Sequence, residues 1–271
     1  MKMTTMQRCM NYSVILLMTL VVMTPLVVGI YTSLLPTEDL IQGNIFSSNL
    51  SLGNYISAIC ETPIIRYFLN SLLISTLTMV GSVAVSALCA YPFAFIDFKG
   101  KKIVFALILA TMMIPFEAIV IPNFITVKSM NLLNSYVGLI IPFLASGFGI
   151  FMLRQAFLQI PSDLYEEAQI EGLSHLQFFL KVVLPYSKVN IVVLASYTFL
   201  GSWNQYFCPM LATFTDTVRP VQIGLRQLQS TETFNDWGMI QASAVIIIIP
   251  TLLVLFLGQR HAKINNEGAV K

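Results

Sequence analysis

Five long stretches of the chain contain no charged residue, and a sixth is interrupted only by Glu117. A helix needs about 20 consecutive, mostly apolar residues to cross the hydrocarbon core of a bilayer, and every stretch reaches that length. The pattern therefore predicts an all-α membrane protein with six spanning helices. Their expected bounds are about 12–34, 66–92, 103–127, 135–157, 189–211 and 237–258.

The composition excludes several other classes of protein. The chain is 56% hydrophobic and only 10% charged, whereas soluble domains carry roughly 25% charged residues. A net charge of +2 is too small for an electrostatic nucleic-acid binder, so we expect no nucleic-acid partner. The four cysteines form no C-x-x-C pair, and neither histidine has a His or Cys at metal-ligand spacing. We therefore expect no metal site and no cofactor.

The distribution of basic residues predicts the orientation. Six spans put both termini on one side, and cytoplasmic segments retain Lys and Arg. With both termini inside, the inner segments hold Lys2, Arg8, Lys99, Lys101, Lys102, Arg154, Lys181, Lys188, Arg260, Lys263 and Lys271. The outer segments hold Arg66, Lys128, Arg219 and Arg226. We therefore predict cytoplasmic termini, and a first helix that is retained, because its apolar run is too long for a signal peptide and no clean cleavage site follows.

The sequence carries no sign of its own energy source. It contains no Gly-rich phosphate loop ending in Gly-Lys-Ser/Thr and no G-x-S-x-G elbow, so we expect neither ATP hydrolysis nor other catalysis in this chain. Ion-coupled carriers place ionisable groups inside their spans, and here only Glu117 qualifies. Three hypotheses remain: a transport subunit driven by a partner ATPase, an ion-coupled secondary carrier that uses Glu117, and a membrane scaffold that transports nothing.

The cytoplasmic segment 158–188 has the pattern of two short helices. Ser162 is placed to cap the first helix and Gly172 to end it in a left-handed turn, while Ser174 is placed to cap the second. Leu164 and Ala168 are four residues apart and share a helix face, which is suited to fill a groove in a partner. The alternative is an amphipathic helix that lies at the membrane interface without a partner.

The same segment resembles a known motif. The run Glu166-Glu167-Ala168-x3-Gly172, followed by Phe179 and Leu184-Pro185, is similar to the EAA loop of permease subunits of binding-protein-dependent ABC importers. In that family the loop forms a coupling helix that sits in a cleft of the cytoplasmic ATPase. The resemblance implies that Glu166, Glu167, Ala168 and Gly172 dock the ATPase. This sequence departs from the family at Gln169, which replaces the second Ala, and at Glu171, where sugar-type members usually have Asp.

Further fragments in the same order resemble the carbohydrate permeases of this class. They are Asn70-Ser71-Leu72, Met113-Ile114-Pro115, Leu133-Asn134-Ser135-Tyr136-Val137-Gly138-Leu139 and Gly201-Ser202-Trp203-Asn204-Gln205-Tyr206. The resemblance is closest to the second permease of the maltose and sn-glycerol-3-phosphate type. It implies the type I importer permease fold, with residues 1–271 as a single transmembrane domain in a bacterial cell membrane. The implied partners are a homologous permease in a heterodimer, a cytoplasmic ABC ATPase dimer, an extracytoplasmic solute-binding protein and membrane lipid.

Candidate residues for the solute path lie in the third and fifth predicted spans. Trp203, Asn204, Gln205 and Tyr206 combine aromatic faces with polar side chains, a mixture that suits a hydroxylated solute, and Glu117 is the one acidic residue inside a predicted span. The alternative is that Trp203 and Tyr206 belong to the outer aromatic belt. No basic residue lies deep within a span, so we predict a neutral carbohydrate or polyol. The other substrate hypothesis is sn-glycerol-3-phosphate or a glycerophosphodiester, with the phosphate charge met by partner subunits.

Overall fold

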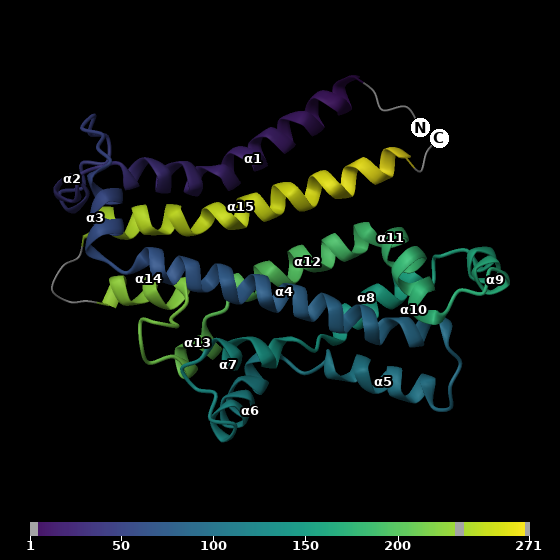
Figure 1. The fold of residues 1–271 in the computed structure, drawn as a ribbon. Helices are drawn as coiled ribbons and strands as arrows, with labels where there is room; N and C mark the ends of the chain where they lie inside the picture. The colour runs from purple at the N-terminus through teal and green to yellow at the C-terminus, as the bar shows by residue number, and fades with distance from the viewer. Residues whose placement is uncertain (1–4, 231–235, 269–271) are drawn as a thin grey trace. The chain divides into compact units, whose positions relative to one another are not determined.

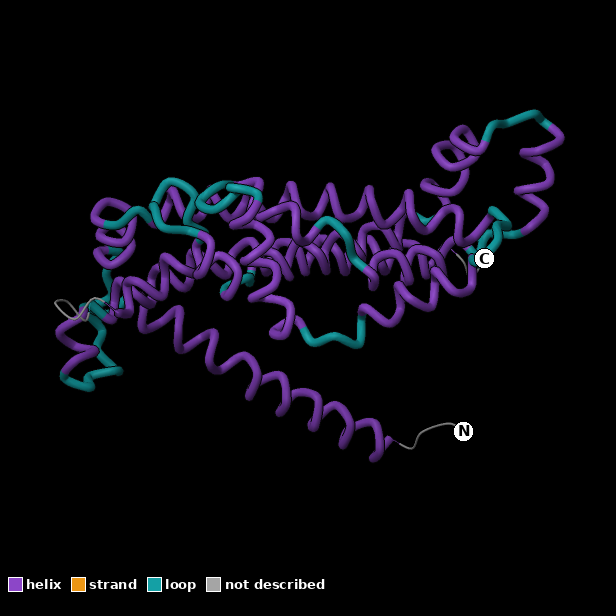
Figure 2. Tube along the Cα trace, turned by 90° about the horizontal axis from the view of Figure 1, so that it is seen from below, coloured by secondary structure: helices purple, strands orange, loops and turns teal. Residues whose placement is uncertain are grey.

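The computed structural model describes residues 5–230 and 236–268. Within these residues every regular element is helical and no strand is present (Figure 2). The chain packs as two compact units, one formed by residues 1–65 with 224–249 and the other by residues 66–223 with 250–271. The predicted all-α class is confirmed.

The first unit is built around a long apolar helix at the start of the chain. Its helices are α1 (Thr5–Ser33), α2 (Thr37–Ile41) and α3 (Gly53–Glu61), together with parts of α14 (Val221–Ser230) and α15 (Trp237–Gly268). The Asn54 side chain of α3 donates hydrogen bonds to the backbone oxygens of Ser33, at 2.8 Å, and Leu35, at 2.7 Å. These bonds satisfy carbonyl groups that the end of α1 leaves without a helical partner, so α3 caps α1.

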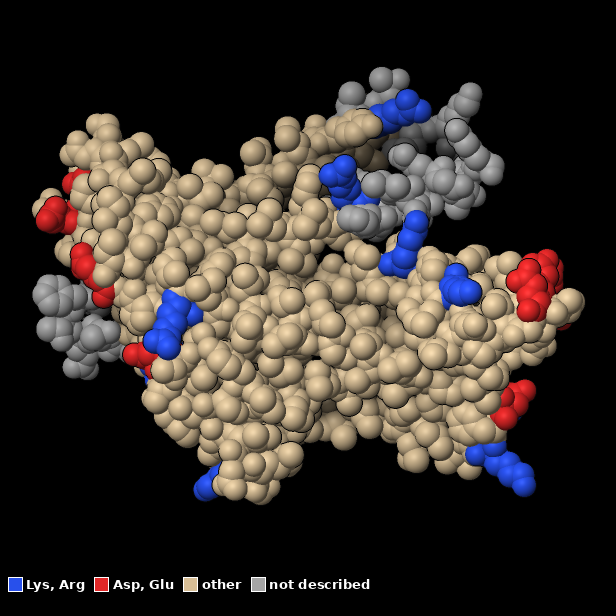
Figure 3. All heavy atoms as spheres, viewed as in Figure 1, with Lys and Arg blue, Asp and Glu red and all other residues tan. Residues whose placement is uncertain are grey.

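The second unit contains the remaining helices, which Figure 1 labels along the chain. They are α4 (Ile64–Phe95), α5 (Lys101–Thr111), α6 (Phe116–Ser129), α7 (Tyr136–Ile140), η1 (Ile141–Phe143), α8 (Gly147–Phe157), α9 (Ser162–Ile170), α10 (His175–Phe178), η2 (Phe179–Val183), α11 (Leu184–Tyr186), α12 (Lys188–Trp203) and α13 (Phe207–Ala212). Helix α8 packs against both α5 and α12. On the face that Figure 3 shows, charged side chains gather toward the two ends and leave a largely uncharged band between them, as a bilayer requires.

In the part of the chain that the structure describes, three helices are long and apolar enough to cross a membrane by themselves, and three bent pairs of helices raise that number to six if each pair is one span. The predicted span 103–127 holds two helices, because α5 and α6 meet at an angle of 98°. Pro115 explains the break, since proline lacks a backbone donor and disfavours helical geometry in the residue before it. The predicted span 189–211 also holds two helices, because α12 ends at Trp203 and α13 begins at Phe207.

A stripe of small hydroxyl residues runs along α4. Its members recur at helical spacing and are at most 2% exposed: Ser71, Ser75, Thr78, Ser82 and Ser86. Small side chains let helices approach closely in membranes. Helix α8 comes close to α4 at one point of the stripe, because a Cβ atom at Gly149 would collide with Oγ of Ser86. The stripe thus brings α8 against α4 in the second unit.

Candidate functional site

Helix α9 packs one face against the core of its own unit. Ala168 is only 5% exposed, and Leu164 is half-buried against the same core. The ring of Tyr165 stacks on Phe95 of α4 at 5.6 Å between ring centroids, and it meets Phe178 edge-on at 5.1 Å. In this structure the face of α9 that carries Leu164 and Ala168 is therefore turned toward its own chain. Burial of these two apolar side chains inside the chain stabilises the fold.

The opposite face of α9 is acidic and solvent-exposed. Asp163, Glu166, Glu167 and Ile170 follow the spacing i, i+3, i+4 and i+7, which puts them in one stripe, and all four are exposed. The Ile170 side chain is 86% exposed. No salt bridge involves these carboxylates among the residues that the structure describes. An exposed apolar side chain beside carboxylates that form no ion pair makes this face of α9 negatively charged.

Gly172 ends α9 as predicted. Its φ is +72°, in the left-handed region that glycine adopts without strain. The backbone N–H of Leu173 donates to the Ala168 carbonyl at 2.9 Å, and that of Gly172 donates to the Gln169 carbonyl at 3.1 Å. These two bonds form a Schellman motif, which turns the chain sharply toward α10.

The N-terminal caps differ between the two short helices. Ser174 caps α10 as predicted, in a capping box in which its Oγ accepts from the Gln177 backbone N–H at 3.3 Å and its own N–H donates to Gln177 Oε1 at 2.9 Å. Ser162 is not the cap of α9, because Pro161 takes that position and Ser162 is already helical. The Ser162 hydroxyl instead donates to the Asp163 side chain at 3.3 Å.

An aromatic cluster joins α9 and α10 to the C-terminal end of α4. Phe95 meets Phe178 edge-on at 5.2 Å, and Tyr91 meets Phe179 in the same way at 5.4 Å. The Tyr91 hydroxyl also lies 3.0 Å from Nδ1 of His175. Phe179 begins the short π-helix η2, an irregularity that often accompanies functional sites. Because edge-to-face pairs add to simple burial, the cluster ties α9 firmly to α4.

Helix α4 also lines a cavity of about 580 Å³ that is open on one side. The cavity is lined by hydroxyl, amide and aromatic side chains with a few apolar groups: Thr78, Ser82, Phe116, Phe143, Ser146, Tyr197, Thr198, Leu200, Gly201, Ser202, Asn204 and Gln205. None of these described residues is charged. The hydroxyls of Thr78 and Ser82 are buried and have no hydrogen-bond partner within the described part of the chain. Buried hydroxyls without partners are costly, and neither oxygen has a polar neighbour within hydrogen-bond distance among the described residues.

Of the residues predicted for the path, Asn204 and Gln205 line this cavity. Trp203 is 1% exposed and lies between Phe199, stacked at 5.8 Å, and Phe68, edge-on at 5.4 Å. In this structure the Trp203 ring packs inside the chain and does not open onto the cavity. Tyr206 pairs with Phe207, and Glu117 is exposed in the first turn of α6, where its charge suits the helix dipole.

Sequence reasoning missed Thr78, Ser82, Ser146 and Thr198. A signal for two of them was present, since Thr78 and Ser82 are four residues apart in a charge-free stretch and so share a helix face. Ser146 and Thr198 carry no such signal, because they reach the cavity only through the packing of α8 and α12.

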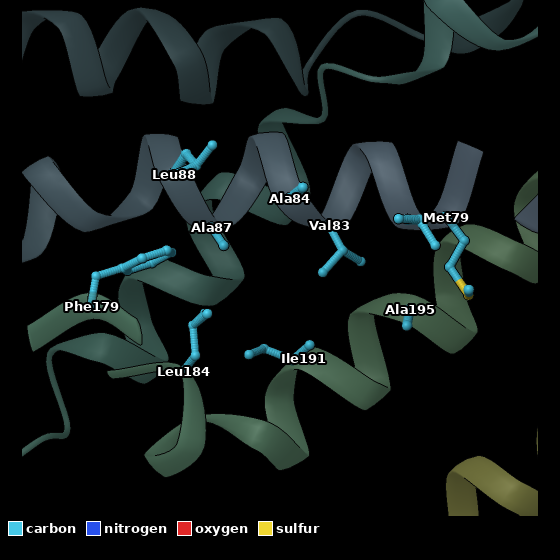
Figure 4. Close-up of a pocket in the computed structure, with 10 residues that line it drawn as sticks. Met79, Val83, Ala84, Ala87, Leu88, Phe179, Leu184, Ile191 and Ala195 are labelled. Atoms are coloured by element: carbon cyan, nitrogen blue, oxygen red, sulfur yellow. The ribbon is translucent and has the colours of Figure 1, made fainter. Parts of the chain in front are cut away.

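A second hollow, of about 420 Å³, lies between α4 and the segment from η2 to α12. Figure 4 shows its lining, which includes Val83, Ala87, Phe179, Leu184 and Ile191. Every lining side chain is apolar, so the hollow offers no donor or acceptor to a hydroxylated solute. The hydroxyl-lined cavity is the better candidate for a polar ligand.

Comparison with known proteins gives consistent matches. Residues 82–264 match the family described as the binding-protein-dependent transport system inner membrane component. The sn-glycerol-3-phosphate transport system permease protein UgpE of Yersinia pestis is 35% identical over 201 residues, which cover 74% of this chain and 72% of the relative. The protein of the same name from Pectobacterium atrosepticum is 31% identical over 250 residues and covers 89% of both chains.

Solved structures share the fold. A chain of a bacterial ABC transporter involved in the import of the acidic polysaccharide alginate superposes with a TM-score of 0.87 at 20% identity, covering 96% of this chain and 99% of the other. A chain of the MetNI methionine ABC transporter in an inward-facing conformation gives a TM-score of 0.57 at 18% identity, covering 74% and 95%. At these identities the likeness concerns the fold alone.

Proposed function

This chain belongs to the family of binding-protein-dependent transport system inner membrane components, and on that premise we propose that it forms half of the path by which an ATP-driven importer carries a neutral carbohydrate or polyol. It is a multi-pass permease subunit of an ABC importer. The observation that carries the choice of solute is the hydroxyl-lined cavity beside α4 and α12.

The lining of that cavity suits a hydroxylated solute. Asn204 and Gln205 add amide groups that donate and accept hydrogen bonds, and Thr78 and Ser82 belong to the same lining. Phe116 and Phe143 supply aromatic faces, against which the apolar face of a sugar ring packs. A bound phosphate would call for Arg or Lys, and the described lining has neither.

The relatives favour a second solute. Proteins named as sn-glycerol-3-phosphate permeases match this chain at 35% and 31% identity, so import of that ester or a glycerophosphodiester is the alternative. In that case the homologous permease, with which this chain pairs, supplies the cationic groups that meet the phosphate charge.

ATP hydrolysis belongs to a partner. The exposed face of α9, with Glu166, Glu167 and Ile170, docks a cytoplasmic ATPase dimer, and the aromatic cluster transmits the movement of α9 to α4. Helix α9 carries the docking surface and packs against α4, and α4 lines the cavity. A movement that the ATPase imposes on α9 therefore reaches the solute cavity through α4.

The orientation of the chain follows from the same arrangement. Both termini lie in the cytoplasm, and each bent helix pair counts as one span. A solute-binding protein delivers its solute to the opposite face of the membrane.

The test is uptake by the complete complex in liposomes, with ATP inside and the binding protein outside. Thr78→Val removes a cavity hydroxyl at nearly constant size, and we expect the solute concentration for half-maximal uptake to rise about five- to tenfold, since a hydrogen bond contributes roughly 1 kcal/mol. Ser86→Ala is the control, because Ser86 is equally buried in the same stripe but does not line the cavity. Equal effects of the two variants would refute the cavity as the solute site.

The same assay separates an ATP-driven importer from an ion-coupled carrier. Glu117→Gln removes the one carboxyl in the predicted spans, and we expect uptake to stay within twofold of the parent and to depend on ATP. An ion-coupled carrier would lose uptake in this variant and would respond to an uncoupler at constant ATP. A scaffold that transports nothing would show no uptake with any solute.

A further inference from the structure

A further cavity, which the proposed transport mechanism does not use, lies at the turn between α4 and α5, beside α8. It measures about 390 Å³ and is lined by Asp97, Lys101, Lys102, Phe105, Ala106, Leu109 and Arg154. Three of its side chains are cationic and one is anionic. None of them lines the solute cavity or belongs to α9, so the proposed transport mechanism gives this hollow no role.

Only one of the three cations is neutralised. The Lys101 ammonium group pairs with Asp97 at 3.2 Å and donates to the Ile96 carbonyl at 2.9 Å. Lys102 is exposed, and within residues 5–230 and 236–268 no hydrogen bond or salt bridge is found for it. The hollow therefore carries surplus positive charge.

Arg154 is held in place with part of its guanidinium free. Its Nε donates to the Phe93 carbonyl at 3.0 Å, and the guanidinium carbon lies 4.3 Å from the centroid of the Phe105 ring. Its terminal amino groups have no acceptor within the described part of the chain. A guanidinium whose orientation is already determined matches a phosphate well, because it donates two parallel hydrogen bonds.

The lining changes from cationic to apolar along one face of α5. Lys102, Phe105, Ala106 and Leu109 follow the spacing i, i+3, i+4 and i+7, so they form one stripe that starts at the N-terminus of the helix and continues for two turns. A free phosphate would use only the first turn of this stripe. An amphiphile with a phosphate at one end and a hydrocarbon chain behind it would use the whole stripe.

We infer that this hollow binds an anionic glycerophospholipid of the cytoplasmic leaflet, with its phosphate on Arg154 and Lys102 and an acyl chain along Phe105, Ala106 and Leu109. The inference rests on the orientation given under the proposed function, which places the start of α5 at the cytoplasmic interface. Basic hollows between helices at that interface are where anionic headgroups bind.

The test measures lipid retained by the whole importer complex. The complex is purified in detergent, titrated separately with phosphatidylglycerol and phosphatidylcholine, and the bound lipid is counted by native mass spectrometry. We expect the parent to prefer phosphatidylglycerol and Lys102→Gln to reduce that preference about fivefold, the effect of one cation beside an anionic lipid. Lys99→Gln is the matched control, because Lys99 is exposed in the same turn but does not line the hollow.

A second variant tests the apolar part without changing charge. Ala106→Phe fills the hollow from an exposed position of α5, and we expect it to lower lipid retention at least as much as Lys102→Gln does. Retention that is unchanged in Ala106→Phe, or that falls equally in Lys99→Gln, would overturn the proposal. Displacement of the lipid by millimolar inorganic phosphate would also overturn it, since the site would then be one for a free anion.

The readout is independent of transport. A complex that retains phosphatidylglycerol through Lys102 but shows no ATP-driven uptake would refute the proposed function and leave the lipid site standing. A complex that transports normally but shows no preference between the two lipids would refute the lipid site alone.

Discussion

The hydroxyl of Tyr91 lies 3.0 Å from Nδ1 of His175, and this contact joins α4 directly to the helix that follows the Gly172 turn. The two residues are 84 positions apart in the chain. Tyr91 shares α4 with Thr78 and Ser82, which line the solute cavity, so a movement of α9 and α10 reaches the cavity through one continuous helix.

Tyr91→Phe tests this connection because it removes the hydrogen bond and keeps the ring. We expect uptake per ATP hydrolysed to fall about fivefold, as loss of roughly 1 kcal/mol predicts, while the complex still assembles. The measurement is the ratio of solute imported to phosphate released in liposomes. Tyr186→Phe is the control, since Tyr186 is 53% exposed on α11. An unchanged ratio in Tyr91→Phe would show that the contact plays no part in coupling.

The two faces of α9 are expected to respond differently to truncation. Ile170→Ala should change the free energy of unfolding by less than about 0.5 kcal/mol, because the side chain is 86% exposed, but it should weaken ATPase binding roughly tenfold. Tyr165→Ala should lower the melting temperature of the permease by itself, because it removes two aromatic contacts. Calorimetry and ATPase titration would distinguish them. A drop in melting temperature for Ile170→Ala would place that residue in the core instead.

Gly172 is constrained by its backbone angle and not by space. A Cβ atom there would meet nothing within 4 Å, yet φ is +72°. Left-handed geometry costs other residues about 1–2 kcal/mol, and Asn tolerates it best. We therefore expect Gly172→Leu to lose most ATP-driven uptake and Gly172→Asn to keep most of it. Equal uptake in both variants would mean that the turn has no role in coupling.

The close approach of α8 to α4 predicts a stability defect that a second change relieves. Gly149→Ala should destabilise the permease by roughly 1–3 kcal/mol, since the added Cβ collides with the Ser86 hydroxyl. Removing that hydroxyl with Ser86→Gly should recover part of the loss. Thermal unfolding of the four proteins in the double-mutant cycle measures the coupling. Gly201→Ala is the control, because nothing lies within 4 Å of its Cβ position, and additive effects would exclude the predicted contact.

The sequence by itself determined the class of fold and several local features. Apolar, charge-free stretches of about 20 residues are unfavourable in water and match the thickness of the bilayer core. They therefore predict membrane helices independently of how those helices pack. Gly172 and Ser174 also behave as predicted, because a left-handed turn and a capping box depend on residues close together in the chain.

Only the tertiary structure decided which faces are buried and what they line. The apolar face of α9 has the same periodicity whether it meets a partner or its own core, and the packing of Tyr165 on Phe95 resolved that choice. Trp203 is likewise buried by Phe68, far away in sequence. The cavity gathers side chains from several helices, and the 98° bend before α6 brings Phe116 to it. Such contacts depend on which distant segments bury each other's apolar surface, and a local sequence pattern does not predict this.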